Sequence, residues 1–198
     1  MPVQPSDLFP IAIFKLIHTM DTVKILDRTF RIYLREEEIQ SRIREVAAQI
    51  SHDLKGKNPL FIGVLNGAFI FAADLFREIS TPAEISFIKV ASYEGTSSCG
   101  TVSNLIGLNE SLEGRTVVIV EDIIDSGLSM THLIHEINKQ NPDEIRICSL
   151  LVKPGNLKVE LDIPYCCFRI PNDFIVGYGL DYDRYGRGLR DIYIVTED

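Results

Sequence analysis

Three carboxylates, two hydroxyl groups and a glycine follow one another closely in the segment 117–129, VVIVEDIIDSGLS. The groups that could do chemistry are Glu121, Asp122, Asp125, Ser126, Gly127 and Ser129. Backbone N–H groups and hydroxyls around a glycine can bind a phosphate group. Carboxylates can accept hydrogen bonds from sugar hydroxyls or bind a metal ion, but they would repel phosphate alone. The segment therefore predicts a site for a ligand that carries phosphate, sugar hydroxyls and a metal ion.

A buried strand and a helix must position these groups. The residues from Val117 to Val120 are all β-branched, which predicts a strand of a parallel sheet covered on both faces. We expect a helix from Met130 to about Gln140. The loop between such a strand and the next helix is where open α/β sheets bind ligands, because free N–H groups point out of the turn. An ordinary strand-to-helix turn with surface acids is the alternative, since short motifs also occur by chance.

Strand-like and helical segments alternate along the rest of the chain. Strands are expected at residues 22–34, 60–65, 85–90 and 145–152, and helices at residues 35–54 and 68–79. This order predicts an α/β fold with a doubly wound, mainly parallel sheet and flanking helices. Residues 20–198 should form one domain, in which residues from about 154 to 198 make most of a small hood over the C-terminal edge of the sheet. Residues 1–19 are expected to be an N-terminal extension outside the core.

Two further loops have the composition of binding loops. Asn66-Gly67 follows the strand expected at residues 60–65 and is a candidate second anion site, although Asn-Gly alone indicates only a turn. Residues 91–100 are rich in glycine and serine around Ser92 and Tyr93. They predict either a lid that excludes water from the site or an exposed connection.

The C-terminal part of the chain combines a lysine, an aromatic residue, an acid and an arginine. Lys153 follows the strand expected at residues 145–152. Phe174 could stack on a planar base, Asp181 could approach a metal ion, and Arg187 could pair with a diphosphate. A core position for Phe174 and a surface ion pair for Arg187 are the alternatives.

Composition limits the partners. The chain of 198 residues has a net charge of −8, which argues against a surface built to hold nucleic acid. The apolar stretch at residues 9–17 is interrupted by Pro10 and Lys15 and is too short to span a membrane. The four cysteines show no CxxC spacing, so we expect reduced thiols in a cytoplasmic protein.

Taken together, these segments resemble the hypoxanthine-guanine phosphoribosyltransferases, in that family's order and over nearly all of residues 20–197. The resemblance implies the type I phosphoribosyltransferase fold and an enzyme of purine salvage with Mg²⁺ as cofactor. Such an enzyme transfers the 5-phosphoribosyl group of phosphoribosyl diphosphate (PRPP) to N9 of hypoxanthine or guanine, which gives IMP or GMP and diphosphate. We further expect a homo-oligomer, either a dimer or a tetramer.

The resemblance also implies a role for each segment. The residues implied to bind PRPP and its phosphate are Glu121, Asp122, Asp125, Ser126, Gly127, Leu128 and Ser129, with Asp125 as the general base. The residues implied to bind diphosphate are Asn66, Gly67 and Arg187. The residues implied to contact the purine are Lys153, Phe174, Ile175 and Asp181. The implied lid residues are Ser92 and Tyr93, and the implied metal ligands are Glu121, Asp122 and Asp181.

Two residues depart from the family pattern. Asn66 replaces a basic residue that is usual in the diphosphate loop, and Leu128 occupies a position that is lysine in some members. The family often has a cis peptide bond in front of the position that Asn66 occupies. The Asn66 substitution removes a charge but leaves the backbone N–H donors of the loop.

Two other functions remain open. One is phosphoribosyl transfer to another base, such as adenine, orotate or uracil, and the other is nucleotide binding by a regulator without turnover. Lys153 as a hydrogen-bond donor favours a 6-oxo group over a 6-amino group, which is itself a donor. The presence of Asp125, Asp181 and Arg187 together favours an enzyme.

Overall fold

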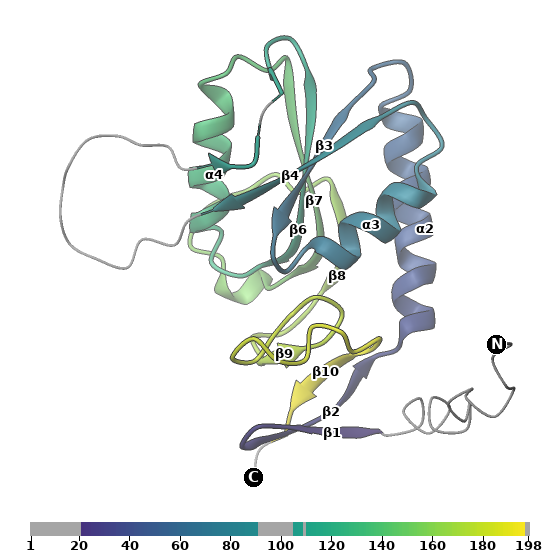
Figure 1. Ribbon diagram of the computed structural model, residues 1–198, viewed down its shortest axis with the longest axis vertical. Helices are drawn as coiled ribbons and strands as arrows, with labels where there is room; N and C mark the ends of the chain where they lie inside the picture. The colour runs from purple at the N-terminus through teal and green to yellow at the C-terminus, as the bar shows by residue number, and fades with distance from the viewer. Residues whose placement is uncertain (1–20, 91–104, 109, 197–198) are drawn as a thin grey trace, which may run out of the picture.

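The computed structural model describes residues 21–90, 105–108 and 110–196 (Figure 1). The strands are β1 (Thr22–Ile25), β2 (Arg28–Leu34), β3 (Leu60–Leu65), β4 (Glu84–Val90), β5 (Leu105–Ile106), β6 (Thr116–Ile124), β7 (Glu144–Val152), β8 (Tyr165–Arg169), β9 (Ile175–Val176) and β10 (Ile192–Val195). The helices are α2 (Glu36–Asp53), α3 (Phe69–Glu78), α4 (Leu128–Asn138) and the short 3-10 helix η3 (Pro154–Asn156). No helix in this part of the chain is long and apolar enough to cross a membrane.

The larger sheet is mainly parallel and confirms the predicted α/β class. Its strand order is β5-β4-β3-β6-β7-β8, and the edge strand β5 runs antiparallel to β4. Helices α2 and α3 cover one face and α4 covers the other (Figure 1). The side chains of β6 alternate accordingly: Val118 and Val120 pack in the core with α2 and α3, whereas Val117 and Ile119 pack with α4. The sheet is therefore doubly wound, and the paired strands β3 and β6 bring their C-terminal ends together.

A second, antiparallel sheet forms a small separate layer with the order β1-β2-β10-β9 (Figure 1). We call this sheet, with the loops at residues 177–191, the hood. The sequence predicted a hood made mostly of residues 154–198, but two of its four strands come from the N-terminal side. Strand β8, which lies within residues 154–198, joins the larger sheet instead.

Burial explains why both ends of the chain contribute to the hood. The segment 22–34 was expected to be one strand, but it is a hairpin that turns at Leu26, where φ is +53°. Ile25 and Phe30 of this hairpin form a small core with Val176 and Tyr193. A two-stranded ribbon is marginal alone in water, so each end of the chain needs the other to bury its apolar face.

Candidate active site

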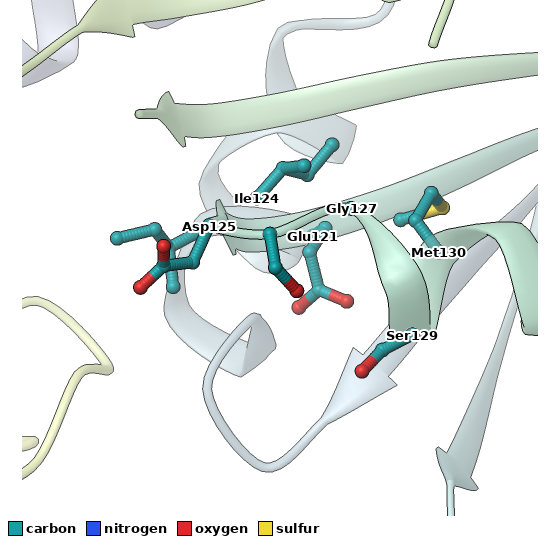
Figure 2. Close-up of a pocket in the computed structure, with 8 residues that line it drawn as sticks. Glu121, Ile124, Asp125, Gly127, Ser129 and Met130 are labelled. Atoms are coloured by element: carbon teal, nitrogen blue, oxygen red, sulfur yellow. The ribbon is translucent and has the colours of Figure 1, made fainter. Parts of the chain in front are cut away.

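A pocket of about 110 Å³ lies where β6 ends and α4 begins (Figure 2). The lining residues are Glu121, Ile123, Ile124, Asp125, Ser126, Gly127, Ser129 and Met130. Figure 2 shows the side chains of Glu121, Asp125 and Ser129 projecting to the same side of the loop. The pocket thus contains all the residues predicted to bind PRPP except Asp122 and Leu128.

Gly127 shapes the loop of this pocket. Its φ of +79° lies in the left-handed region, and a Cβ at this position would come within 2.8 Å of Val159 Cγ2. Helix α4 begins directly after it, and the first N–H groups of a helix have no partner within the helix. The N–H of Leu128 donates to Ser126 Oγ at 3.4 Å, while the Leu128 side chain is half exposed. The loop offers backbone and hydroxyl donors at the positive end of a helix, which suits a phosphate group.

The two adjacent acids lie within β6, whereas the sequence predicted them just after the strand. The strand continues because Ile123 and Ile124 keep its apolar character and pair with β7. Neighbouring residues of a strand point to opposite faces. Glu121 lines the phosphate pocket, whereas Asp122 lies against Gly67. A Cβ added to Gly67 would overlap the carboxylate of Asp122. Burial, together with the neighbouring Asp122 carboxyl, raises the pKa of Glu121 well above its ordinary value.

Asp125 is contacted by two residues from the end of β7 and the turn that follows. Lys153 Nζ lies 3.4 Å from Asp125 Oδ2, and the side-chain amide of Asn156 donates to Asp125 Oδ1. The Lys153 side chain is only 9% exposed, whereas the Asp125 side chain is 47% exposed. The backbone N–H of Lys153 donates to the carbonyl of Ile124 at 3.0 Å, which fixes the end of β7 beside the loop. The structure therefore joins the predicted general base to the predicted purine-binding lysine.

The predicted diphosphate residues lie where the hood contacts the loop after β3. Arg187 pairs with Asp181 at 2.6 Å and donates to the carbonyl of Gly179 at 2.6 Å. Asp181 also accepts the N–H of Arg184 at 2.7 Å. A Cβ on Gly179 would overlap the carbonyl oxygen of Gly67, so the hood loop lies directly on the Gly67 loop. Arg187 therefore forms an ion pair, as the alternative to diphosphate binding predicted, and this pair with Asp181 lies beside the Asn66-Gly67 loop.

The predicted base-stacking residue Phe174 is 40% exposed and packs against other aromatic rings. Its ring centre lies 6.2 Å from that of Phe30 and 5.7 Å from that of Tyr182, and the Arg28 guanidinium carbon lies 5.9 Å from it. Ile175 is buried in β9, so its backbone rather than its side chain is available to a ligand. Phe174 thus packs on the aromatic residues of the hood and also leaves part of its ring exposed.

The carboxylates fit a magnesium ion that is held partly by substrate. Within the described residues, no three acidic, histidine or cysteine side chains converge as they would around a metal held by protein alone. Glu121 and Asp122 are close enough for Asp122 to affect the titration of Glu121, whereas Asp181 is held by Arg187. Mg²⁺ usually keeps several waters and binds one or two carboxylates plus substrate phosphates. The Glu121–Asp122 pair is therefore a better candidate than Asp181 for binding such an ion.

Three further points concern the Leu65–Asn66 peptide bond, the predicted lid and Asn156. The Leu65–Asn66 peptide bond is cis, as the resemblance implied. The lid residues Ser92 and Tyr93 lie outside the described residues, so their role stays a prediction. Asn156 was not predicted as a site residue, because its contact with Asp125 depends on the 3-10 turn after β7, for which an isolated asparagine gives no sequence signal.

Comparisons with known proteins agree with this geometry. Residues 31–183 match the model of the phosphoribosyl transferase domain family. The chain is 41% identical over all its 198 residues to a hypoxanthine-guanine phosphoribosyltransferase of Mycobacterium avium, of which it covers 92%. It is 44% identical over 174 residues to the enzyme of the same name from Mycobacterium tuberculosis, a match that covers 84% of this chain and 85% of that protein.

Solved structures show the same fold. A hypoxanthine-guanine phosphoribosyltransferase from Bacillus anthracis is 38% identical with a TM-score of 0.74, over 84% of this chain and 96% of that one. The hypoxanthine phosphoribosyltransferase of Trypanosoma cruzi is 37% identical with a TM-score of 0.73, over 84% of this chain and 97% of that one. The site and these matches together place the chain in the phosphoribosyltransferase family, as a member of its hypoxanthine-guanine branch.

Proposed function

We propose that this enzyme transfers the 5-phosphoribosyl group from PRPP to N9 of hypoxanthine and guanine. The observation that carries the proposal is the position of Lys153 Nζ, 3.4 Å from Asp125 Oδ2 and beside the phosphate pocket. A purine that accepts a hydrogen bond from Lys153 through its 6-oxo group would bring its imidazole edge to Asp125. Lys153 would then recognise the base and Asp125 would accept its proton from adjacent positions in the site.

The phosphate pocket holds the 5′-phosphate of the substrate in this proposal. The N–H groups at the start of α4 and the hydroxyls of Ser126 and Ser129 donate to the phosphate oxygens. Glu121 and Asp122 accept hydrogen bonds from the ribose hydroxyls.

Asp125 acts as the general base. As the bond between N9 and the ribose carbon forms, the purine loses a proton from its N7 side, and the Asp125 carboxylate accepts it. Lys153 exchanges its contact with Asp125 for the 6-oxo group, while Asn156 keeps the other carboxylate oxygen in place. General-base catalysis of this kind contributes about 10²–10⁴-fold to the rate.

The leaving diphosphate is bound where the hood meets β3. Arg187 supplies a fixed positive charge, and the backbone of Asn66 and Gly67 supplies N–H donors. Glu121 and Asp122 would hold Mg²⁺ together with PRPP, and the ion would supply Lewis-acid neutralisation of the diphosphate charge. Phe174 stacks on the purine, and the backbone of Ile175 contacts its edge.

One assay with a set of bases tests the proposal. PRPP and Mg²⁺ are incubated with hypoxanthine, guanine, xanthine, adenine, orotate or uracil in turn, and nucleotides are separated by chromatography. We expect IMP and GMP with little or no AMP, because Lys153 donates to a 6-oxo group and would face the N–H donors of a 6-amino group. Strong formation of AMP without IMP or GMP would show that the substrate assignment is wrong. If no base gives a nucleotide, the alternative of a nucleotide-binding regulator without turnover is favoured.

Two further proposals concern the state of the protein in the cell. Three cysteines in the described part of the chain, Cys148, Cys166 and Cys167, are free thiols, which supports a reducing, cytoplasmic location. We also propose a homo-oligomer, a dimer or a tetramer. Light scattering after size-exclusion chromatography measures this mass directly.

A further inference from the structure

Tyr178 links the hood to the helical layer through a partly buried hydrogen-bond network. The residue follows β9 and is 3% exposed. Its hydroxyl donates to Asp74 Oδ2 of α3 at 2.5 Å. The side-chain amide of Gln40, from α2, donates to the same oxygen at 2.6 Å and to the Tyr178 hydroxyl at 3.0 Å. One phenol thus connects three elements that are far apart in the sequence.

The backbone around Tyr178 has a conformation that needs support. Gly177, Tyr178 and Gly179 all have positive φ, of +104°, +49° and +101°. A bulky side chain is rare in the left-handed region and stays there only when surrounding contacts hold it. The N–H of Tyr178 donates to the carbonyl of Leu189 at 2.9 Å, and the N–H of Gly179 donates to the carbonyl of Arg187 at 2.9 Å. The side-chain network supplies the third point of support.

The residue after Tyr178 touches both parts of the proposed diphosphate site. The carbonyl of Gly179 accepts Arg187 Nη1 at 2.6 Å. Its Cα lies so close to the carbonyl of Gly67 that a Cβ would overlap it. A shift of this backbone would therefore move Arg187 relative to the Asn66-Gly67 loop.

The charges around the phenol keep it a hydrogen-bond donor. Burial, and then the hydrogen bond to Asp74, raise the pKa of Tyr178 far above its ordinary value. Asp74 itself faces Arg77 of the same helix at 3.9 Å. The Tyr178 hydroxyl accordingly keeps its proton near neutral pH and remains a donor to Asp74.

We propose that Tyr178, with Asp74 and Gln40 behind it, is a positioning residue for the diphosphate half of the site. Tyr178 does not line the phosphate pocket, and its hydroxyl bonds to Asp74 rather than to a purine-binding residue. It fixes the Gly179 carbonyl, which holds Arg187 against the Gly67 loop. The inference rests on the proposed function only in that Arg187 and the Asn66-Gly67 loop bind diphosphate. Loss of the network should weaken the binding of PRPP and of diphosphate and leave purine affinity unchanged.

A matched pair of tyrosine variants tests the inference. Tyr165 is also buried and its hydroxyl also donates to an aspartate, Asp53 at 3.3 Å, but it lies on β8 away from the site. Tyr178→Phe should raise the KM for PRPP and the Kd for Mg²⁺–diphosphate at least fivefold, with the KM for hypoxanthine changed less than twofold. Tyr165→Phe should lower the thermal stability and leave all three constants within twofold of wild type.

Variants of Asp74 provide the second line of evidence. Asp74→Asn keeps a side-chain oxygen that can accept the Tyr178 hydroxyl, so it should be milder than Asp74→Ala. The double variant Tyr178→Phe/Asp74→Ala should be no worse than the more damaging single variant, because both remove the same contact. Circular dichroism at the assay temperature confirms that each variant is folded.

The outcomes separate this inference from the proposed function. If wild-type protein makes nucleotide but Tyr178→Phe binds PRPP and diphosphate as wild type does, Tyr178 has only a structural role and the inference is wrong. The inference is also wrong if the purine and PRPP constants rise together. If wild-type protein makes no nucleotide from any base, the proposed function is wrong, while the diphosphate titration by calorimetry still decides the role of Tyr178.

Discussion

Lys153 and Asp125 form an ion pair at the edge of the phosphate pocket, with Nζ 3.4 Å from Oδ2. The lysine is almost fully buried and the aspartate is half exposed, so the pair presents its carboxylate to solvent. A buried ammonium needs a partner, and Asp125 provides it in the absence of a base. In the proposed mechanism, the 6-oxo group of a purine replaces this partner, so recognition of the base is coupled to release of the carboxylate.

Replacing Lys153 should affect the purine more than PRPP. We expect Lys153→Ala to raise the KM for hypoxanthine by roughly 10-fold or more, the scale of a lost hydrogen bond to a charged group, with little change in PRPP affinity. Steady-state kinetics with each substrate varied in turn measures the two effects. Lys158→Ala is the control, because Lys158 is exposed on the segment after the same turn. An effect confined to PRPP would remove Lys153 from the purine site.

Asn156 should contribute to catalysis through the orientation of Asp125. Its side-chain amide donates to Oδ1, so Asn156→Ala leaves the carboxylate free to rotate. We expect kcat to fall by about 3- to 10-fold, the equivalent of one modest hydrogen bond, with the KM values little changed. Asn172→Ala is the control: Asn172 follows β8, its side chain lies beside Gly155 of that turn, and its loss should have no effect on kcat. Equal kcat values for the two variants would mean that Asn156 does not orient the base.

The phosphate loop should require glycine at position 127 for two separate reasons. Gly127 and Gly114 both have left-handed φ, +79° and +67°, but an added Cβ meets Val159 only at Gly127 and has open space at Gly114. Gly114→Ala should therefore cost roughly 1–2 kcal/mol of unfolding free energy, the cost of the left-handed backbone alone. Gly127→Ala should cost more and also raise the KM for PRPP. Urea denaturation and kinetics of the two variants provide the comparison, and equal stability losses would show that the loop tolerates a side chain.

The diphosphate loop should depend on its backbone more than on the Asn66 side chain. Asn66→Lys should change the KM for PRPP less than about threefold, since an exposed ion pair contributes under about 1 kcal/mol. Gly67→Ala should cause a severe loss of kcat/KM, because its Cβ would overlap the Asp122 carboxylate. Gly188→Ala is the control, since an added Cβ there has open space. If Asn66→Lys tightens PRPP binding tenfold or more, the native loop is a weakened site that relies on Arg187.

Much of the larger sheet could be predicted from the sequence because its signals are local. The four β-branched residues at 117–120 indicate a strand covered on both faces, and the apolar spacing in residues 35–54 indicates α2. The end of β6 could not be placed, because the acids Glu121 and Asp122 look like a strand end. Pairing with β7 carries the strand to Ile124.

The features that the sequence did not predict depend on contacts between distant parts of the chain. The hood pairs residues near position 30 with residues near position 195, and neither segment indicates its partner. The sequence predicted separate roles for Lys153 and Asp125 but not the ion pair between them. The two residues lie close together because β6 pairs with β7. The Gln40–Asp74–Tyr178 network has no motif at all, since each residue is ordinary for its own element.

The most direct test of the proposed mechanism is the turnover of Asp125→Asn. Asparagine keeps the shape of the side chain and removes its ability to accept a proton, so the phosphate loop should be preserved. We predict that single-turnover formation of IMP from hypoxanthine falls by about 10²-fold or more, while PRPP affinity measured by calorimetry stays within about threefold of wild type. A turnover rate close to that of wild type would contradict the mechanism, because Asp125 would then only shape the loop and the base would have to be another group.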